Sequence, residues 1–301
     1  MLVAVAATVG GAAIAYLGYT ETAGPSGAVR GYFAALARSD AAGALAFGDV
    51  PDGRRTLLTT TVLREQQRIA PLRDFSIVST HRDGAKATVD VEYTLRFPGR
   101  EVPVAATVAL HASSGDWRLD QTAISTELQA EGGRQRQSVL GGPIPTGPVL
   151  LFPGALPIRV DTPYLQLDPS RDSVSFGAPT TTSVYLDVTD RARSAMLAAV
   201  RAALNTCLTG ARQYACPLPD GRSVPGSVHG RVTGAMRTTR VYLDLQNPVG
   251  RIGFEASATI TGRYRRLNFH NRPVSGPGHF SLDVSAAAYA VAPLTTTWTT
   301  S

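Results

Sequence analysis

The chain opens with a continuous apolar stretch. Residues 2 to 18 carry only apolar or small side chains apart from Thr8 and Tyr16. A helix of this length, rising about 1.5 Å per residue, covers most of a hydrocarbon core of about 30 Å. No basic residue precedes the stretch, and Glu21 follows it where signal cleavage needs a small residue, so residues 1 to 19 are predicted as an uncleaved transmembrane anchor. A cleaved signal peptide and a buried core helix are the alternatives.

Helical periodicity follows a predicted hinge at residues 20 to 27. One apolar stripe is formed by Val29, Tyr32, Phe33, Leu36 and Ala37. Ser39-Asp40 predicts the start of a second, shorter helix. A third helical stretch begins near Thr56 and is ended by Pro71, because proline cannot continue the backbone ladder.

From Phe75 the pattern has the period of strands. The clearest strand is residues 87 to 97, where Ala87, Val89, Val91, Tyr93, Leu95 and Phe97 alternate with polar residues. Asp83-Gly84 and Pro98-Gly99 predict turns on either side of it. Further strands are predicted at residues 102–110, 117–119 and 122–128. Helices followed by an antiparallel meander indicate an α+β domain over residues 28 to 130.

Glycine and proline mark a boundary between two predicted domains. Residues 131 to 148 are rich in both and predict an exposed linker. In the domain that follows, residues 149 to 301, Thr189 or Asp190 caps the strongest helix of the chain, whose apolar face ends at Cys207. Strands are predicted at residues 182–188, 228–233, 240–245, 252–260, 264–269 and 280–291. The predicted fold is thus an N-terminal transmembrane helix and two α+β domains, the second with one main helix against an antiparallel sheet.

Residues 28 to 46 resemble the opening helices of the SnoaL-like, nuclear-transport-factor-two-like superfamily. They read AVRGYFAALARSD and then AAGALA, and the resemblance covers about residues 26 to 130. It implies helices that wrap a curved antiparallel sheet into a cone. Enzymes of this superfamily place acidic residues and histidines inside the cone, whereas Asp90 and Glu92 share the polar face of the clearest strand with Arg96. The resemblance therefore favours a binding domain, with an enzyme or small-ligand binder using the cone pocket as the alternative.

The two cysteines, Cys207 and Cys216, are separated by eight residues. In an oxidising compartment so close a pair usually forms a disulfide. Free thiols and a metal site are the alternatives, although the nearest histidine, His229, stands alone and zinc needs four ligands. Leu204-Asn205-Thr206-Cys207 also resembles the Leu-x-Thr-Cys core of sortases, which gives a thiol transpeptidase at Cys207 as a remote alternative. The anchor and the helical cysteine followed by Cys-Pro are similar to envelope proteins of high-GC Gram-positive bacteria.

Arginine supplies almost all of the positive charge in a chain of net charge +6, since Lys86 is the only lysine. Basic and aromatic residues are interleaved in the segment RYRRLNFHNR, residues 263 to 272. Nucleic-acid binding would fit a cytoplasmic protein, but the predicted compartment argues against it. Two interpretations remain: a solvated strand face with Leu267 and Phe269 inward, or a patch for an anionic lipid or wall polymer. The patch residues would be Arg263, Arg265, Arg266 and Arg272.

The sequence carries no metal, nucleotide or nucleophile signature, and no cofactor is predicted. Whether the protein is an enzyme stays open, with a non-catalytic role preferred. The prediction is a membrane-anchored, extracytoplasmic binding or scaffolding protein of the cell envelope, or a secreted one if the signal is cleaved. The expected partners are the membrane, through the N-terminal helix, and an envelope protein, anionic lipid or wall polymer, but not nucleic acid.

Overall fold

The chain forms two compact units whose segments alternate along the sequence. The computed structural model describes residues 24–130, 137–177, 181–210, 216–244, 251–290 and 296–299. Unit 1 comprises the described residues up to Gln129 with Val139–Ile158 and Ser170–Val184. Unit 2 comprises the described parts of Ala130–Ser138, Arg159–Pro169 and Tyr185–Ser301. The sequence-based boundaries, at residues 28 to 130, 131 to 148 and 149 to 301, stay a prediction.

The predicted α+β class with a membrane-spanning helix is wrong for the described residues. Of these, 49% lie in strands and 19% in four helices. None of the described helices is both long and apolar enough to cross a membrane. Strand exceeds helix because five long strands alone hold more residues than the four helices: Leu72–Asp83, Lys86–Phe97, Arg100–Ser113, Arg251–Arg263 and His279–Tyr289. The described segments between residues 137 and 188 add only short strands, which prolines and glycines interrupt. The predicted anchor, residues 1 to 19, lies outside the described residues.

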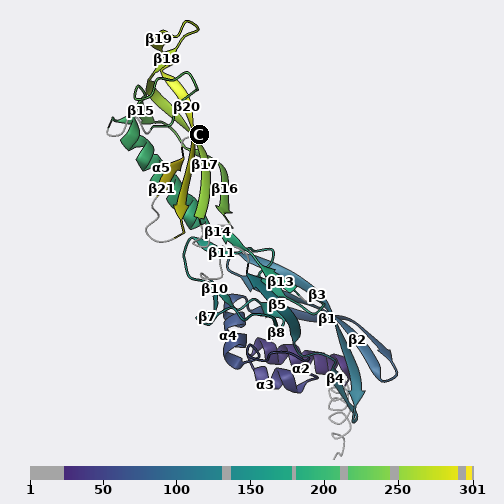
Figure 1. Ribbon diagram of the computed structural model, residues 1–301. Helices are drawn as coiled ribbons and strands as arrows, with labels where there is room; N and C mark the ends of the chain where they lie inside the picture. The colour runs from purple at the N-terminus through teal and green to yellow at the C-terminus, as the bar shows by residue number, and fades with distance from the viewer. Residues whose placement is uncertain are drawn as a thin grey trace, which may run out of the picture. The chain divides into compact units, whose positions relative to one another are not determined.

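Unit 1 begins with three helices, which precede a sheet of order β1-β2-β3-β4 (Figure 1). The elements are α2 (Pro25–Ala37), α3 (Ala41–Ala46), α4 (Thr60–Ile69), β1 (Leu72–Asp83), β2 (Lys86–Phe97), β3 (Arg100–Ser113) and β4 (Asp116–Leu119). Helix α2 begins at Pro25, inside the predicted hinge. Proline is tolerated there because the N–H groups of the first helical turn have no partner within the helix. Asp40 and Thr59 cap α3 and α4, accepting hydrogen bonds from the N–H groups of Gly43 and Val62.

The clearest sequence signal, the alternation of residues 87 to 97, is confirmed in β2. Its alternate residues from Ala87 to Phe97 are buried. They join one core with the apolar stripe of α2, which includes Val29, Phe33 and Leu36. The remaining short strands of unit 1 form a sheet of order β13-β5-β8 and a β9–β12 pair. These are β5 (Ile124–Ala130), β8 (Pro148–Leu151), β9 (Gly154–Ala155), β12 (Ser173–Val174) and β13 (Thr181–Val184).

Unit 2 is built on one helix and a five-stranded antiparallel sheet in which β17 pairs with β15, β16 and β20 (Figure 1). These elements are α5 (Asp190–Leu208), β15 (His229–Val232), β16 (Arg237–Asp244), β17 (Arg251–Arg263), β20 (His279–Tyr289) and β21 (Thr296–Thr299). Thr189 caps α5, and its hydroxyl accepts a hydrogen bond from the Ala192 N–H. Met196, Val200 and Leu204 of α5 share a core that includes Phe254, Ile260 and Leu282 of the sheet.

A small hairpin of strands β18 (Arg265–Leu267) and β19 (Pro273–Ser275) continues from the end of β17 (Figure 1). The predicted strand at residues 264 to 269 is therefore shorter, because residues 268 to 272 form a turn. Unit 2 also contains a pair of strands β11 (Leu165–Leu167) and β14 (Leu186–Val188). Of the remaining short strands, β7 (Gly142–Pro143) belongs to unit 1, and β6 (Gln137–Val139) and β10 (Ile158–Val160) lie where segments of the two units join in sequence.

Candidate functional site

The two cysteines are joined in unit 2, as predicted. Cys207 lies in the last turn of α5 and forms a disulfide with Cys216, with the two Cα atoms 5.6 Å apart. Both residues are buried. Because a thiolate nucleophile at Cys207 would first require reduction of this bond, the sortase-like alternative loses its support.

The interior of unit 1 is filled by aromatic side chains. Tyr32, Phe33 and Tyr93 are almost completely buried, and the ring of Phe33 stacks on Phe75 with centroids 4.6 Å apart. The Tyr32 hydroxyl donates a hydrogen bond of 2.9 Å to the Thr122 carbonyl. Burial raises the pKa of both tyrosines, so both are neutral phenols at physiological pH. An interior packed in this way does not favour a ligand pocket between the helices and the sheet of unit 1.

The carboxylates of β2 lie on its polar side, as the alternation predicts. Asp90 and Glu92 line a surface groove of about 520 Å³ in unit 1, together with Val78 and Phe176. The hydroxyls of Ser79 and Thr107 donate to the Asp90 carboxylate at 2.6 and 2.7 Å, and these bonds lower its pKa. Two hydroxyl groups already donate hydrogen bonds to the Asp90 carboxylate and favour its ionised form. This arrangement is more typical of a solvated sheet surface than of an acid-base catalyst.

The described residues contain no group of three or more histidine, cysteine, aspartate or glutamate side chains able to hold a metal ion. The nearest approach to one is at His111 in unit 1. Its Nδ1 lies 2.6 Å from Asp120 Oδ1, and its Nε2 lies 3.8 Å from Asp49 Oδ2. The cluster is partly exposed and also includes Arg118, whose Nε lies 3.9 Å from Asp49 Oδ1, so the Asp49 carboxylate has a cationic partner within the protein.

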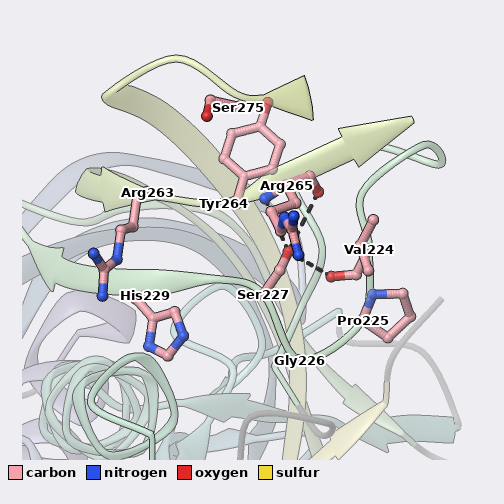
Figure 2. A pocket seen from close by; sticks show the side chains of 9 residues that line it. All are labelled: Val224, Pro225, Gly226, Ser227, His229, Arg263, Tyr264, Arg265 and Ser275. Carbon is pink, nitrogen blue, oxygen red and sulfur yellow. Dashed lines mark hydrogen bonds between the residues drawn. The ribbon is translucent and has the colours of Figure 1, made fainter. Parts of the chain in front are cut away.

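The arginine-rich segment of unit 2 borders a pocket of about 420 Å³ (Figure 2). The pocket lies where β15, the end of β17 and the start of β18 adjoin a loop at residues 224 to 227. Among the described residues, its lining contains arginine, histidine and serine and no aspartate or glutamate. The lining residues are Val224, Pro225, Gly226, Ser227, His229, Arg263, Tyr264, Arg265 and Ser275.

Strand pairing places His229 beside Arg263. The two residues are register partners at one end of the β15–β17 ladder, and Figure 2 shows their side chains on the same side of the strands. The next pair is Gly230 and Gly262, where a Cβ on either residue would collide with the backbone of the opposite strand. Two glycines therefore bring the strands together next to the basic pair.

A serine fixes the loop against β18. The Ser227 hydroxyl accepts a hydrogen bond of 2.9 Å from the Arg265 N–H and donates one of 2.7 Å to the Val224 carbonyl (Figure 2). The Val224 N–H in turn donates to the Arg265 carbonyl at 2.8 Å. Because the hydroxyl proton is directed to the backbone, Ser227 positions the loop and does not act as an activated nucleophile.

Tyr264 anchors the base of the hairpin. Its ring is buried and meets Phe280 edge-on, with the centroids 4.9 Å apart. The Gly276 N–H donates to the Tyr264 carbonyl at 2.9 Å, and a Cβ on Gly276 would collide with the tyrosine ring. Arg263 and Arg265 flank this anchored residue, so their backbone positions are fixed while their side chains stay exposed.

The structure divides the predicted arginine patch into two pairs. Arg263 and Arg265 line the pocket, whereas Arg266 and Arg272 lie farther along the hairpin and its turn. All are exposed, and none forms an ion pair with another described residue. Exposed guanidinium groups without carboxylate partners are well suited to bind phosphate or carboxylate oxygens.

Sequence reasoning did not find two contributors to this region. Ser227 and Arg222 lie about 40 residues before the hairpin and reach it through an isolated bridge between Ser223 and Arg266. The turn residues Pro219-Asp220-Gly221 mark the start of this loop, but no local signal indicates which strand it adjoins. The inward placement considered for Phe269 is wrong: its side chain is 88% exposed.

No protein-family model and no curated protein matches the chain. Among the solved structures that match it, two cover about a third of the chain. A SEC-C motif containing protein from Rhodopseudomonas palustris has 21% identity and a TM-score of 0.29, with 35% of this chain and 82% of that chain covered. An LEH-like epoxide hydrolase from M. tuberculosis has 20% identity and a TM-score of 0.25, with coverages of 34% and 82%. Similarity at this level assigns the chain to no family and carries no argument about its activity.

Proposed function

We propose that the protein is an extracytoplasmic, non-catalytic binding protein of the cell envelope, and that unit 2 holds an anionic partner at the arginine-lined pocket. The single observation that carries this proposal is a pocket that presents Arg263 and Arg265 without a carboxylate in its lining. Guanidinium groups bind phosphate and carboxylate oxygens in bidentate geometry. The likeness of residues 26 to 130 to the SnoaL-like superfamily also stays a proposal, and it adds no ligand.

The location outside the cytoplasm rests on the disulfide. Disulfides persist in oxidising compartments and are rare in the cytosol. The Cys207–Cys216 bond fastens the end of α5, and so it serves the unit that carries the pocket. Anionic wall polymers and lipid headgroups, both available in an envelope, present the oxygens that arginine binds.

Binding of a soluble polyanion tests the proposal. The full chain is titrated with polyphosphate by calorimetry, with uncharged dextran as the control polymer. Replacement of Arg263 and Arg265 by glutamine removes two charge-assisted contacts, and we expect at least about a tenfold loss of affinity. Added salt should weaken the wild-type interaction, because it screens exposed charges.

The matched control keeps the change in charge and moves it away from the pocket. Arg191, in the first turn of α5, and Arg237, at the start of β16, are exposed arginines of the same unit. The double variant Arg191→Gln/Arg237→Gln should keep at least half of the wild-type affinity. Equal losses of affinity in the two double variants would show that binding depends on net charge and not on the pocket. Failure of the wild-type chain to bind polyphosphate would refute the proposal.

A further inference from the structure

The turn between β18 and β19 presents an apolar side chain to solvent. Phe269 is 88% exposed, the largest exposed fraction among the described large hydrophobic residues. Val274 of β19 is also exposed, at 37%. Single exposed hydrophobic residues are common on protein surfaces and are not by themselves a site. The surroundings of Phe269 therefore decide whether its exposure has a function.

The turn that carries Phe269 is held in one shape by hydrogen bonds. The side-chain oxygen of Asn268 accepts from the N–H groups of His270 and Arg272, at 2.9 and 3.0 Å. The backbone adds bonds from the Asn268 N–H to the Arg272 carbonyl and from the Asn271 N–H to the Asn268 carbonyl. Asn271 adopts a φ of 56°, a conformation that asparagine tolerates better than most residues. Phe269 thus projects from a preorganised turn.

The hairpin is also fixed to the body of unit 2. A two-stranded ribbon of three residue pairs is marginal on its own in water. Here the Leu267 N–H donates to the Arg222 carbonyl at 2.9 Å, and Ser223 bridges to Arg266. Tyr264 holds the base of the hairpin against Phe280. The fold therefore supports a projecting hairpin (Figure 1), and Phe269 of its turn is exposed.

The exposed phenylalanine is surrounded by positive charge. Residues 263 to 275 contain four arginines and no acidic residue. Arg222 adds a fifth guanidinium, whose Cζ lies 4.7 Å from the centroid of the Phe269 ring. Arg266 and Arg272 are each three residues from Phe269 in sequence, so at most about 11 Å of extended chain separates them from it. An apolar tip within reach of several cations is complementary to a surface that is apolar inside and anionic outside.

We infer that the β18–β19 turn is a membrane-docking element, in which Phe269 enters the interface of an anionic lipid layer while Arg222, Arg266 and Arg272 contact the lipid phosphates. An amphipathic element binds such a layer through buried apolar area together with attraction to anionic headgroups. The long arginine side chains reach the headgroups as the ring enters the acyl boundary. This inference rests on the proposed function, since it names the source of the anionic groups that the arginines bind.

Vesicle binding tests the inference with the full chain. Sedimentation is measured with vesicles of phosphatidylcholine containing phosphatidylglycerol, and with vesicles of phosphatidylcholine alone. The apolar residues 1 to 19 are expected to bind either bilayer, so the measured quantity is the gain in partitioning on anionic over neutral vesicles. We expect this gain to be clear for the wild-type chain and about tenfold smaller for Phe269→Ser. The matched control is Tyr289→Ser, which removes another exposed aromatic residue of unit 2, at 44% exposure, and should leave partitioning within twofold.

A spectroscopic arm does not depend on a loss of binding. In Phe269→Trp, an added tryptophan reports the depth of the turn, measured against the wild-type chain with its two tryptophans elsewhere. Its emission should shift to shorter wavelength with anionic vesicles and be quenched by lipids brominated in the acyl chain. Emission that does not change on vesicle binding would overturn insertion of the turn.

The failures of the two proposals are distinguishable. If polyphosphate binds through Arg263 and Arg265 while anionic vesicles bind no better than neutral ones, the partner is a soluble polymer. If Phe269→Ser keeps the full gain on anionic vesicles, the turn is not the docking element. In both cases the lipid inference is wrong and the proposed function stands. If the wild-type chain neither binds polyphosphate nor prefers anionic vesicles, both fail. Equal binding to neutral and anionic vesicles would overturn the role given to the arginines.

Discussion

In unit 1 several exposed arginines face carboxylates, whereas the arginines of the β18–β19 hairpin in unit 2 do not. Arg96 lies 2.8 Å from Glu101 and 3.9 Å from Asp74, and Arg68 bonds Glu65 at 2.7 Å. The side chains of Arg265, Arg266 and Arg272 form no ion pair with the described residues. Paired charges satisfy one another inside the protein. Unpaired charges that gather at one element repel one another, so the contrast shows that the β18–β19 hairpin, unlike Arg96 or Arg68, has cations available for an anionic partner.

Aromatic residues show the same contrast. Unit 1 buries Tyr32, Phe33 and Tyr93 in its core, whereas unit 2 exposes Phe269 at the hairpin turn. The first arrangement stabilises the fold, because each buried ring removes apolar area from water. The second contributes little to folding. Substitutions at matched positions in the two units can therefore separate residues that hold the fold from residues available for binding.

The largest expected effect separates two phenylalanines. Phe33→Ala empties a site in the core of unit 1, where its ring contacts Phe75 and Tyr93, and should cost about 3 to 5 kcal/mol of unfolding free energy. Phe269→Ala should change the stability of unit 2 by less than about 0.5 kcal/mol. Calorimetric unfolding of both variants measures the difference. A large loss for Phe269→Ala would mean that the hairpin tip is buried in solution.

The disulfide should be the next largest contributor, and only to unit 2. Cys207 and Cys216 are nine positions apart, and the chain-entropy model gives about 2.5 kcal/mol for a loop of this size. The double variant Cys207→Ser/Cys216→Ser should lower the melting temperature of unit 2 and leave that of unit 1 unchanged. Reduction of the wild-type chain provides the control, since it should reproduce the shift. Equal shifts in both units would contradict the assignment of the bond to unit 2 alone.

Two buried tyrosines of unit 1 offer a smaller and sharper test. The Tyr32 hydroxyl donates a hydrogen bond to the Thr122 carbonyl. Tyr32→Phe removes this hydrogen bond and should lower the unfolding free energy by about 1 kcal/mol. The Tyr93 hydroxyl is buried with no hydrogen-bond partner among the described residues. Tyr93→Phe should therefore cost nothing or stabilise unit 1 by up to about 1 kcal/mol. Denaturant titrations should give a lower unfolding free energy for Tyr32→Phe and an unchanged or higher one for Tyr93→Phe. Equal losses of unfolding free energy would contradict the assigned hydrogen bonding.

The sequence predicted the elements whose pattern is local and strong. Alternation gave β2, the apolar stripe and the Thr189 cap gave α5, and spacing gave the disulfide. The predicted fold class failed because the long strands outweigh the helices, and because short strands between prolines have too few residues for either period to show. The arginine patch could be seen as composition, but its geometry depends on contacts such as the Ser223–Arg266 bridge, which join distant segments. One of the two interpretations of this segment places Phe269 inward, because it extends strand alternation into what is a turn.

The smallest expected effect concerns the arginines themselves. Arg96→Gln removes an exposed ion pair with Glu101 and should cost unit 1 about 0.5 kcal/mol or less at low salt. Arg266→Gln removes a charge that lies among like charges, and should leave the stability of unit 2 unchanged or raise it slightly. Both effects should vanish at about 1 M salt, where the screening length falls to about 3 Å. A loss of stability for Arg266→Gln that persists in high salt would mean that this arginine holds the hairpin, and the unpaired charge would then no longer distinguish the hairpin from Arg96 of unit 1.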